Sequence, residues 1–407
     1  MGIAAELAGL SKQQRTAIWA SYLGWTLDAF DFFLMVFMIK AISETFGADV
    51  KAVSEALFFT LAARPAGALV FGLLAEKFGR RPVLMIVILL FSALSAASGF
   101  ARTLSELLLL RGLFGFAMGG EWGIGASLAM ESIPPRLRGP VSGLLQAGYP
   151  SGYLLASAAY FLFFDALGWR YMFLLGLLPA ALVLFIRLHV EESPAYLARE
   201  QDPRAKQGIV AALAQHWKLA AYLVVLMTAF NFFSHGTQDL YPTFLQKQHG
   251  FDTHTVGLLT GIMNVGAIVG ALSIGLLSRR IGRKKAILLA AALALPVIPL
   301  WAFSQTALLL GIGAFLIQFA VQGAWGQVPA HLNELSPPAV RAMFPGFVYQ
   351  LGNLIASRNA VMQARIAESH GDNYALALAL VAGVTALVLL MWAAAGPERS
   401  EGELEAG

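Results

Sequence analysis

Long apolar runs separated by short polar stretches dominate the sequence. A helix that crosses a bilayer needs about 20 largely apolar residues, because the hydrocarbon core is about 30 Å thick and a helix rises about 1.5 Å per residue. Twelve such runs can be placed, six on each side of one long polar stretch. The pattern predicts an all-α membrane protein with twelve transmembrane helices at 17–39, 54–76, 82–100, 107–130, 140–163, 168–188, 219–241, 254–277, 285–303, 307–330, 343–366 and 374–394.

The long polar stretch divides the chain. It contains EESPAYLAREQDPRAKQG and is the longest hydrophilic segment. We expect 1–188 to form an N-terminal six-helix bundle, 189–218 a cytoplasmic linker loop, and 219–407 a C-terminal six-helix bundle with a short cytoplasmic tail. The first apolar run is too long for a signal-peptide core and lacks a small-residue cleavage site, so we expect it to be retained as a span.

The two halves of the pattern repeat at a constant offset of 203 residues. GLLAEKFGRR at Gly72–Arg81 recurs as GLLSRRIGRK at Gly275–Lys284, and ESIPPRLRG at Glu131–Gly139 recurs as ELSPPAVRA at Glu334–Ala342. A third match pairs GGEWG with QGAWG. Repeats of six spans have the same orientation, so the two bundles are expected to be pseudo-symmetric. Internal repeats are typical of secondary transporters, whose binding site lies near mid-membrane between the repeats.

The composition agrees with a lipid environment. Of the 407 residues, 58% are hydrophobic and 13% are charged, whereas a soluble domain carries about 25% charged residues. Cysteine is absent, which excludes disulfides and thiolate metal sites. The sequence contains no Walker motif, metal-ligand cluster or nucleophile elbow. We therefore expect a monomeric membrane protein that is not an enzyme, needs no cofactor or metal, and binds no nucleic acid.

The basic residues predict the orientation. They concentrate in the loops after spans 2, 4 and 8 and in the central stretch, and the alternate loops contain few of them. Because cytoplasmic loops carry the excess of Lys and Arg, we expect an inner-membrane protein with both termini in the cytoplasm. The residues concerned are Arg80, Arg81, Arg136, Arg138, Arg187, Arg199, Arg204, Lys206, Lys218, Arg279, Arg280, Arg283, Lys284 and Lys285.

The first copy of the repeated loop resembles the signature of the major facilitator superfamily. Glu stands where the family usually has Asp, and Arg279 stands at the acidic place of the second copy. Arg111, Gly115 and Gly119 on span 4, and EESP at Glu191–Pro194, are similar to further motifs of that family. The resemblance implies the major facilitator fold and a gating role for Gly72, Glu76, Gly79, Arg80, Arg81, Glu131 and Arg138.

A narrower resemblance lies on span 7, from Asn231 to Thr243. Its pattern of Asn, Ser-His, Thr-Gln-Asp and a final Thr resembles the lactate/pyruvate–proton symporters, which belong to the same family as the sialate–proton symporters. GWTLDAFDFF at Gly24–Phe33 is similar to both kinds of member. The resemblance implies transport of a small monocarboxylate.

Acidic residues inside the spans are candidate proton carriers. A charge at the bilayer centre costs roughly 2.5–3.5 kcal/mol on insertion scales, so such residues are functional candidates. Asp28 and Asp31 on span 1 share a helical face, and two close carboxylates out of water cannot both ionise cheaply. Glu121 on span 4 is a further candidate. The alternative is that Asp28 only neutralises Arg64 on the next span, or that the pair forms a gate.

Span 7 carries a polar stripe. Asn231, His235 and Asp239 follow at i, i+4 and i+8, with Gln238 beside them. The stripe cannot face lipid with unsatisfied polar groups, so it either lines a cavity or packs against another helix. Because histidine titrates near neutral pH, His235 and Asp239 are candidates for proton coupling, and Asn231, His235 and Gln238 for substrate binding.

Arginine and amide side chains supply the remaining candidate contacts. Guanidinium groups bind carboxylates at two points, so Arg64 on span 2 and Arg358 on span 11 are candidate substrate clamps; the alternative for Arg358 is an ion pair with Glu121 or an aspartate. Arg111 is close enough to the end of span 4 to snorkel to the surface. Side chains that could hydrogen-bond a hydroxy or keto group are Gln146, Tyr149, Gln318, Gln322, Tyr349 and Gln350.

These features favour a secondary active transporter that moves a small organic anion and a proton together by alternating access, with the proton gradient as its energy source. Lactate and pyruvate are the expected substrates. The alternative is a larger acid such as sialate, an aromatic acid or a sugar acid. A membrane receptor is disfavoured by the lack of a soluble domain, and a channel is disfavoured by the parallel repeats.

Overall fold

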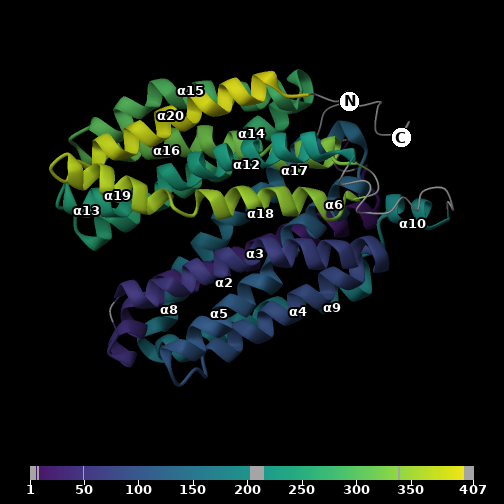
Figure 1. Ribbon diagram of the computed structural model, residues 1–407, viewed down its shortest axis with the longest axis horizontal. Helices are drawn as coiled ribbons and strands as arrows, with labels where there is room; N and C mark the ends of the chain where they lie inside the picture. The colour runs from purple at the N-terminus through teal and green to yellow at the C-terminus, as the bar shows by residue number, and fades with distance from the viewer. Residues whose placement is uncertain (1–5, 7–8, 49, 202–214, 338–339, 398–407) are drawn as a thin grey trace.

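The computed structural model describes residues 6, 9–48, 50–201, 215–337 and 340–397, and all its regular secondary structure there is helical (Figure 1). In the first half the elements are α2 (Lys12–Phe46), α3 (Val50–Phe78), α4 (Arg80–Ser98), α5 (Leu104–Gly119), α6 (Glu121–Ser132), η1 (Pro135–Leu137), α7 (Arg138–Gln146), α8 (Gly148–Met172), η2 (Phe173–Leu177), α9 (Leu178–His189) and α10 (Pro194–Gln201). In the second half they are α12 (Trp217–Gln238), α13 (Tyr241–Lys247), α14 (Thr253–Ile281), α15 (Arg283–Phe303), α16 (Ala307–Trp325), α17 (Val328–Leu335), α18 (Phe344–Ala356), α19 (Asn359–Ser369) and α20 (Tyr374–Ala395).

Each predicted span coincides with a helix or with consecutive helices, and the span 168–188 covers the end of α8, η2 and α9. The pairs α5–α6, α7–α8, α12–α13, α16–α17 and α18–α19 each follow one apolar run. In the described part of the chain, nine helical stretches are long and apolar enough to cross a membrane by length and composition. The remaining three predicted spans correspond to α2, α7–α8 and α18–α19. The predicted all-α fold with two six-helix bundles is confirmed.

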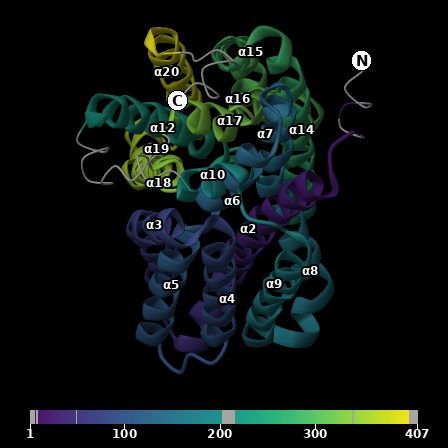
Figure 2. The same cartoon turned by 90° about the vertical axis from the view of Figure 1, so that its right-hand side faces the viewer.

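The two bundles lie side by side, with α2–α9 in one and α12–α20 in the other (Figures 1 and 2). The start of α2, the end of α20 and α10 lie at the same end of the molecule (Figure 1, right). The repeated loops at Gly72–Arg81 and Gly275–Lys284 join α3 to α4 and α14 to α15 at this end. We call it the motif side, and the opposite end the far side. Part of the predicted linker, 202–214, lies outside the described residues.

Small residues bring the polar helices close together. A Cβ added at Gly119 of α5 would lie 2.1 Å from the Arg64 carbonyl oxygen on α3. In the second bundle a Cβ at Gly270 of α14 would lie 2.1 Å from the Phe319 carbonyl oxygen on α16, and the repeat equivalent of this approach in the first bundle is Gly67 of α3 against Phe116 of α5. Such positions admit only glycine, which allows backbones inside a membrane to pack closely. In the first bundle this packing places the polar residues of α3 and of the α5–α6 span next to each other.

The bundles meet tightly on the motif side. A Cβ at Gly143 of α7 would lie 2.3 Å from the Ala271 carbonyl oxygen of α14, and one at Gly123 of α6 would lie 2.8 Å from the Cα of Gly346 on α18. Ser127 of α6 donates to the Arg341 carbonyl oxygen of the other half at 2.8 Å. These contacts close the motif side of the molecule.

Candidate functional site

Five charged side chains gather inside the first bundle. Asp28 and Asp31 on α2, Arg64 on α3, Arg111 on α5 and Glu121 on α6 are each at most 3% exposed. The charges of both arginines act on Asp28, and the charge of Arg64 also acts on Glu121. When all five are ionised, the three acids exceed the two arginines by one negative charge. One bound proton would therefore make the cluster neutral.

Among the described residues, the acids and arginines of this cluster form no direct salt bridges with one another. Asp31 Oδ1 accepts a hydrogen bond from Ser95 at 2.8 Å. The described side chains show no salt bridge between Asp28 and Arg64, and neither carboxylate oxygen of Asp28 has a hydrogen-bond partner among them. Arg111 is fully buried with its guanidinium 3.8 Å from the Phe114 ring centroid. Arg111 therefore does not snorkel to the surface.

His235 lies at the centre of a polar chain in the second bundle. Its Nδ1 lies 3.1 Å from Asp239 Oδ1 and its Nε2 lies 3.2 Å from Asn353 Oδ1 on α18. Asn353 in turn donates to Gln350 Oε1 at 3.4 Å. Both ring nitrogens thus face oxygen acceptors, and only the doubly protonated ring can donate to both. The side chains of His235 and Asp239 are 24% and 34% exposed, so this chain reaches solvent.

Amide and hydroxyl groups extend the polar surface along α12 and α16. Ser234 Oγ accepts from Gln238 at 2.8 Å and from Gln322 at 3.5 Å. Gln318 donates to Thr237 at 2.8 Å, which ties the two helices together. Asn231 instead donates to the Met227 carbonyl oxygen of its own helix.

Aromatic rings occupy the space between the bundles. Tyr149 of α8 stacks on Trp25 of α2, with ring centroids 5.5 Å apart. Tyr349 of α18 lies 4.7 Å from the Trp122 ring and 5.5 Å from the Trp325 ring, so it joins α6 of the first bundle to α16 of the second. Gln146 is buried at the end of α7, and its Oε1 has no hydrogen-bond partner among the described residues.

Arg64 connects the charged cluster to the second bundle. Its charge acts on His235, Tyr149 and Tyr349 as well as on the buried acids Asp28 and Glu121. Arg358 lies elsewhere: it is exposed, its guanidinium is 5.9 Å from the Phe58 ring, and it lines a groove of about 530 Å³ along α19. No described salt bridge joins it to Glu121 or to an aspartate. The structure thus brings Arg64, but not Arg358, to the polar centre.

The repeated loops form an ion-pair network on the motif side. Arg80 pairs with Glu76 at 3.1 Å and with Glu131 at 3.2 Å, and the side chains of all three are at most 3% exposed. The network is buried because the chain after α9 folds over it. Glu76 Oε1 also accepts the backbone N–H of Ala342 from the other half.

The network repeats in the second half at the same offset. Arg283 pairs with Glu334 at 3.2 Å, and these residues stand 203 positions after Arg80 and Glu131. Arg279, which replaces the acid of the motif, pairs with Glu6. Glu6 also lies 3.4 Å from Arg136 of the first half. The hydrogen bond from Arg279, together with the charges of both arginines, lowers the pKa of Glu6.

The EESP segment docks on the first loop. Glu192 accepts from the backbone N–H groups of Arg80 and Arg81 at 2.9 and 3.1 Å, which caps the start of α4. Ser193 donates to Glu131. The guanidinium of Arg81 donates to the Arg187 carbonyl oxygen. This segment therefore covers the ion-pair network.

The other predicted gating residues also lie at this end of the molecule. Gly79 has a φ of 99°, which favours glycine. A Cβ at Gly72 would lie 2.6 Å from the Cα of Met343, so α3 touches the start of α18. Arg138 donates to the Met130 carbonyl oxygen at 3.1 Å rather than to an acid of the network.

Several of these contacts involve residues that were not among the predicted site residues. Asn353 stands three residues after Gln350 on a predicted span, so the polar pattern of that span could have revealed it. Glu6 precedes the first apolar run, and no local pattern points to its bridging role. Among the described residues, no group of three or more His, Asp or Glu side chains is placed to hold a metal ion.

Comparisons with known proteins agree with this arrangement. The family profile described as Major Facilitator Superfamily matches residues 21–357 and 225–406. A carboxylic acid transporter protein homolog of Saccharomyces cerevisiae is 30% identical over 90% of this chain, which spans 63% of that protein's length. The sialic acid transporter NanX of Escherichia coli is 29% identical, and the match covers 93% of each chain.

A solved structure shows the same fold. The proton:xylose symporter XylE aligns over 97% of this chain and 98% of its own, with a TM-score of 0.75 and 18% identity. That likeness agrees with the twelve predicted spans and with the paired bundles. The chain belongs to the Major Facilitator Superfamily and is a multi-pass membrane transporter, not an enzyme.

Proposed function

We propose that this protein is a secondary active transporter for a small monocarboxylate such as lactate or pyruvate, coupled to a proton. The observation that supports this proposal most is the position of Arg64. Its guanidinium is buried, and its charge acts on the buried acids Asp28 and Glu121 and on His235, so a carboxylate and a proton could bind within reach of the same positive charge. The proton gradient would supply the energy for transport, and no cofactor would be needed.

Arg64 is suited to bind the substrate carboxylate. The described residues offer it only Met118 Sδ as a hydrogen-bond partner, at 2.6 Å, and its Nε has none. A planar guanidinium with free donors can bind a carboxylate at two points. The amides of Gln322 and Gln350 and the hydroxyl of Tyr349 would contact the hydroxy or keto group of the substrate. Asn231, Gln146 and Arg358 remain weaker candidates for contact.

Proton binding would neutralise the loaded site. The cluster carries one excess negative charge, and an anionic substrate adds a second. A neutral or nearly neutral site is easier to enclose in a low-dielectric interior than a charged one. The candidate proton carriers are Asp28, Asp31, Glu121 and the pair of His235 and Asp239.

The conformation supports an alternating-access mechanism. The bundles are joined on the motif side, whereas His235 and Asp239 remain partly exposed. We propose that the motif side and both termini are cytoplasmic in a cell inner membrane, because the basic loops lie there. The described state would then be open to the outside. The functional unit would be the monomer.

A larger acid such as sialate is the second candidate. It is favoured by the extended polar wall of Gln238, Gln318, Gln322, Gln350 and Asn353. It also fits the NanX relative, which is a sialic acid transporter. The carboxylic acid transporter homolog and the span 7 pattern favour the smaller acid.

Uptake of labelled lactate into proteoliposomes tests the proposal. We expect accumulation when the outside is acidic and loss of accumulation when a protonophore is added. Arg64→Lys keeps the charge but loses the two-point contact, so it should weaken uptake. Labelled sialate added to the same vesicles separates the two substrates. Uptake of either acid that is unaffected by a pH gradient and by the protonophore would rule out symport.

A further inference from the structure

Glu121 is a buried acid that shares its one arginine charge, that of Arg64, with Asp28. The charge of Arg111 acts on Asp31, and Ser95 donates a hydrogen bond to it. Arg64 acts on both Asp28 and Glu121, so it can neutralise only one of them. Both carboxylate oxygens of Glu121 are buried without a hydrogen-bond partner in the described part of the chain. A buried carboxylate without donors is costly to keep ionised.

The surroundings of Glu121 contain few other charges. From the helices packed against α6, the charged groups that act on it are Asp28 of α2 and Arg64 of α3. His331 of α17 responds instead to Arg283 and Lys284 on the motif side. The protonation of Glu121 is thus tied to the cluster and not to the ion-pair network of the repeated loops.

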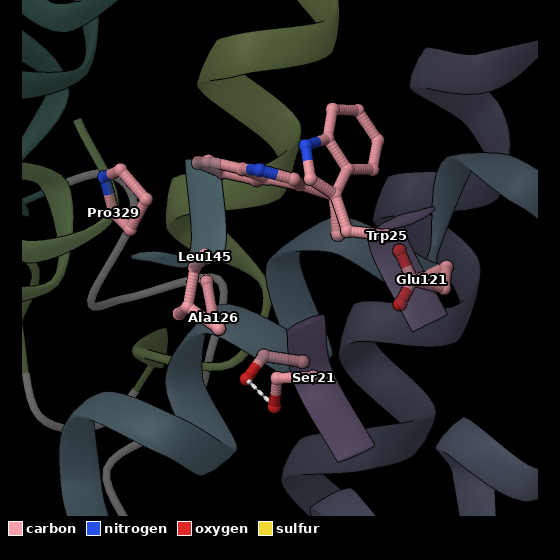
Figure 3. Close-up of a pocket in the computed structure, with 8 residues that line it drawn as sticks. Ser21, Trp25, Glu121, Ala126, Leu145 and Pro329 are labelled. Carbon is pink, nitrogen blue, oxygen red and sulfur yellow. Dashed lines mark hydrogen bonds between the residues drawn. The ribbon is translucent and has the colours of Figure 1, made fainter. Parts of the chain in front are cut away.

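A small cavity lies beside Glu121 (Figure 3). It has a volume of about 10 Å³, which is room for about one water molecule. Glu121, the Ser21 hydroxyl and the Trp25 side chain belong to its walls, and Trp25 Nε1 is buried with no partner among the described residues. Polar walls of this kind are what a bound water requires. The other lining residues are Trp122, Gly125, Ala126, Leu145 and Pro329.

The cavity is on the motif side of Glu121. Ser21 precedes Asp28 by seven residues on α2, which places it about 10 Å nearer the motif-side end of that helix. Asp28 therefore lies toward the middle of the bundle, and the cavity lies on the motif side. Glu121 is the one member of the buried cluster that lines the cavity, and the charge of Asp28 acts on it.

We propose that Glu121 is the group that carries the coupling proton and passes it to the motif side through a water in this cavity. This inference rests on the proposed symport. In the outward-open state a hydronium ion on the Asp28 side breaks one O–H bond, its proton forms the O–H bond of a neutral Glu121 carboxyl group, and water is left behind. In the inward-open state that O–H bond breaks, the proton moves to the cavity water, and the carboxylate returns.

The direct test compares Glu121→Gln with the wild-type protein in proteoliposomes that contain a pH-sensitive dye. Gln has the shape of a neutral Glu but cannot release a proton. We expect substrate-driven proton entry to fall by about tenfold or more, while exchange of internal for external substrate persists. The ratio of protons to substrate is measured for Asp28→Asn in the same assay, because Asp28 is another candidate proton carrier.

A second variant changes the cavity and keeps the carboxyl group. A Cβ at Gly125 would lie 3.5 Å from Glu121 Oε1 and 3.7 Å from Ser21 Oγ, which is ordinary contact, so Gly125→Ala should fold and narrow the cavity. We expect slower proton entry with unchanged substrate affinity. Gly261→Ala is the matched control, because nothing lies within 4 Å of a Cβ there.

The outcomes separate this inference from the proposed function. If Glu121→Gln keeps the wild-type ratio of protons to substrate and Asp28→Asn loses it, Glu121 is not the carrier and symport stands. If wild-type vesicles show no substrate-driven proton entry, symport fails first. If Glu121→Gln does not fold, Gly125→Ala decides, since proton entry equal to that of Gly261→Ala overturns the inference.

Discussion

The hydrogen bond between Glu76 and Ala342 links the two halves on the motif side. Glu76 Oε1 accepts the Ala342 N–H across the halves, and its Oε2 pairs with Arg80 at 3.1 Å within the first half. Glu76→Gln keeps an oxygen acceptor but removes the negative charge. We expect this substitution to favour opening of the motif side.

The size of the shift follows from the contact that opening must break. The Glu76–Arg80 pair lies within one half, so it can persist in both conformations and does not affect their balance. A hydrogen bond to a charged group contributes about 1.5–3 kcal/mol and a neutral one about 0.5–1.5 kcal/mol. The contact across the halves therefore weakens by about 1–1.5 kcal/mol, which is a population shift of about 5- to 13-fold.

The overall stability should fall by more than this. Removing one partner of a buried ion pair costs about 3–5 kcal/mol. Arg80 keeps Glu131 at 3.2 Å, so the lower end of that range applies. Glu76→Gln should thus have two effects of different size: a lower melting temperature, and a smaller change in the free-energy difference between the two conformations.

Spin-label distances measure the shift directly. The chain contains no cysteine, so labels can be attached to Glu44→Cys and His370→Cys, two exposed positions at the far-side ends of α2 and α19. We expect the distribution to move toward shorter distances as the far side closes. Glu106→Gln is the control, because Glu106 is an exposed acid that accepts from Arg102 on the far side. An unchanged distribution together with a lower melting temperature would refute the reasoning and make the network purely structural.

Three further predictions concern the polar centre and the contact between the bundles. Arg64→Lys should weaken substrate binding by about 1–3 kcal/mol at every pH, measured by calorimetry on the purified protein; unchanged affinity would remove Arg64 from the binding site. His235→Gln should abolish the rise in substrate affinity as the pH falls, because Gln cannot take up a proton; an unchanged pH profile would assign that titration to another group. Gly143→Ala should destabilise the state closed on the motif side, since its Cβ would lie 2.3 Å from the Ala271 carbonyl oxygen; spin-label distances equal to those of Gly261→Ala would contradict this.

The sequence predicted the helices well, because an apolar run of fixed length has few alternatives inside a membrane. The predicted span 285–303 corresponds to α15 (Arg283–Phe303), and the span 374–394 to α20 (Tyr374–Ala395). The repeat at 203 residues also pointed to equivalent positions, and the pairs Arg80–Glu131 and Arg283–Glu334 lie at that offset. These features depend on local composition and on duplication, which a sequence displays directly.

Contacts between distant helices were harder to predict. Arg64 and Arg358 both appeared as charged residues within predicted spans, and nothing in the sequence distinguished the buried one from the exposed one. The environment of each depends on the rotation of its helix and on the neighbour that covers it. The same holds for Glu6, whose bridge between Arg136 and Arg279 depends on where the segment before α2 lies.

The docking of EESP on the first bundle shows where the polypeptide could be divided. Glu192 and Ser193 hold the start of α4 and Glu131, so the beginning of the linker is structurally part of the first bundle. Two separate polypeptides that end and restart between Gln201 and Gln215 would keep these contacts and could reassemble by complementation. A break before Glu192 would remove the cap of α4 and leave the first fragment incomplete.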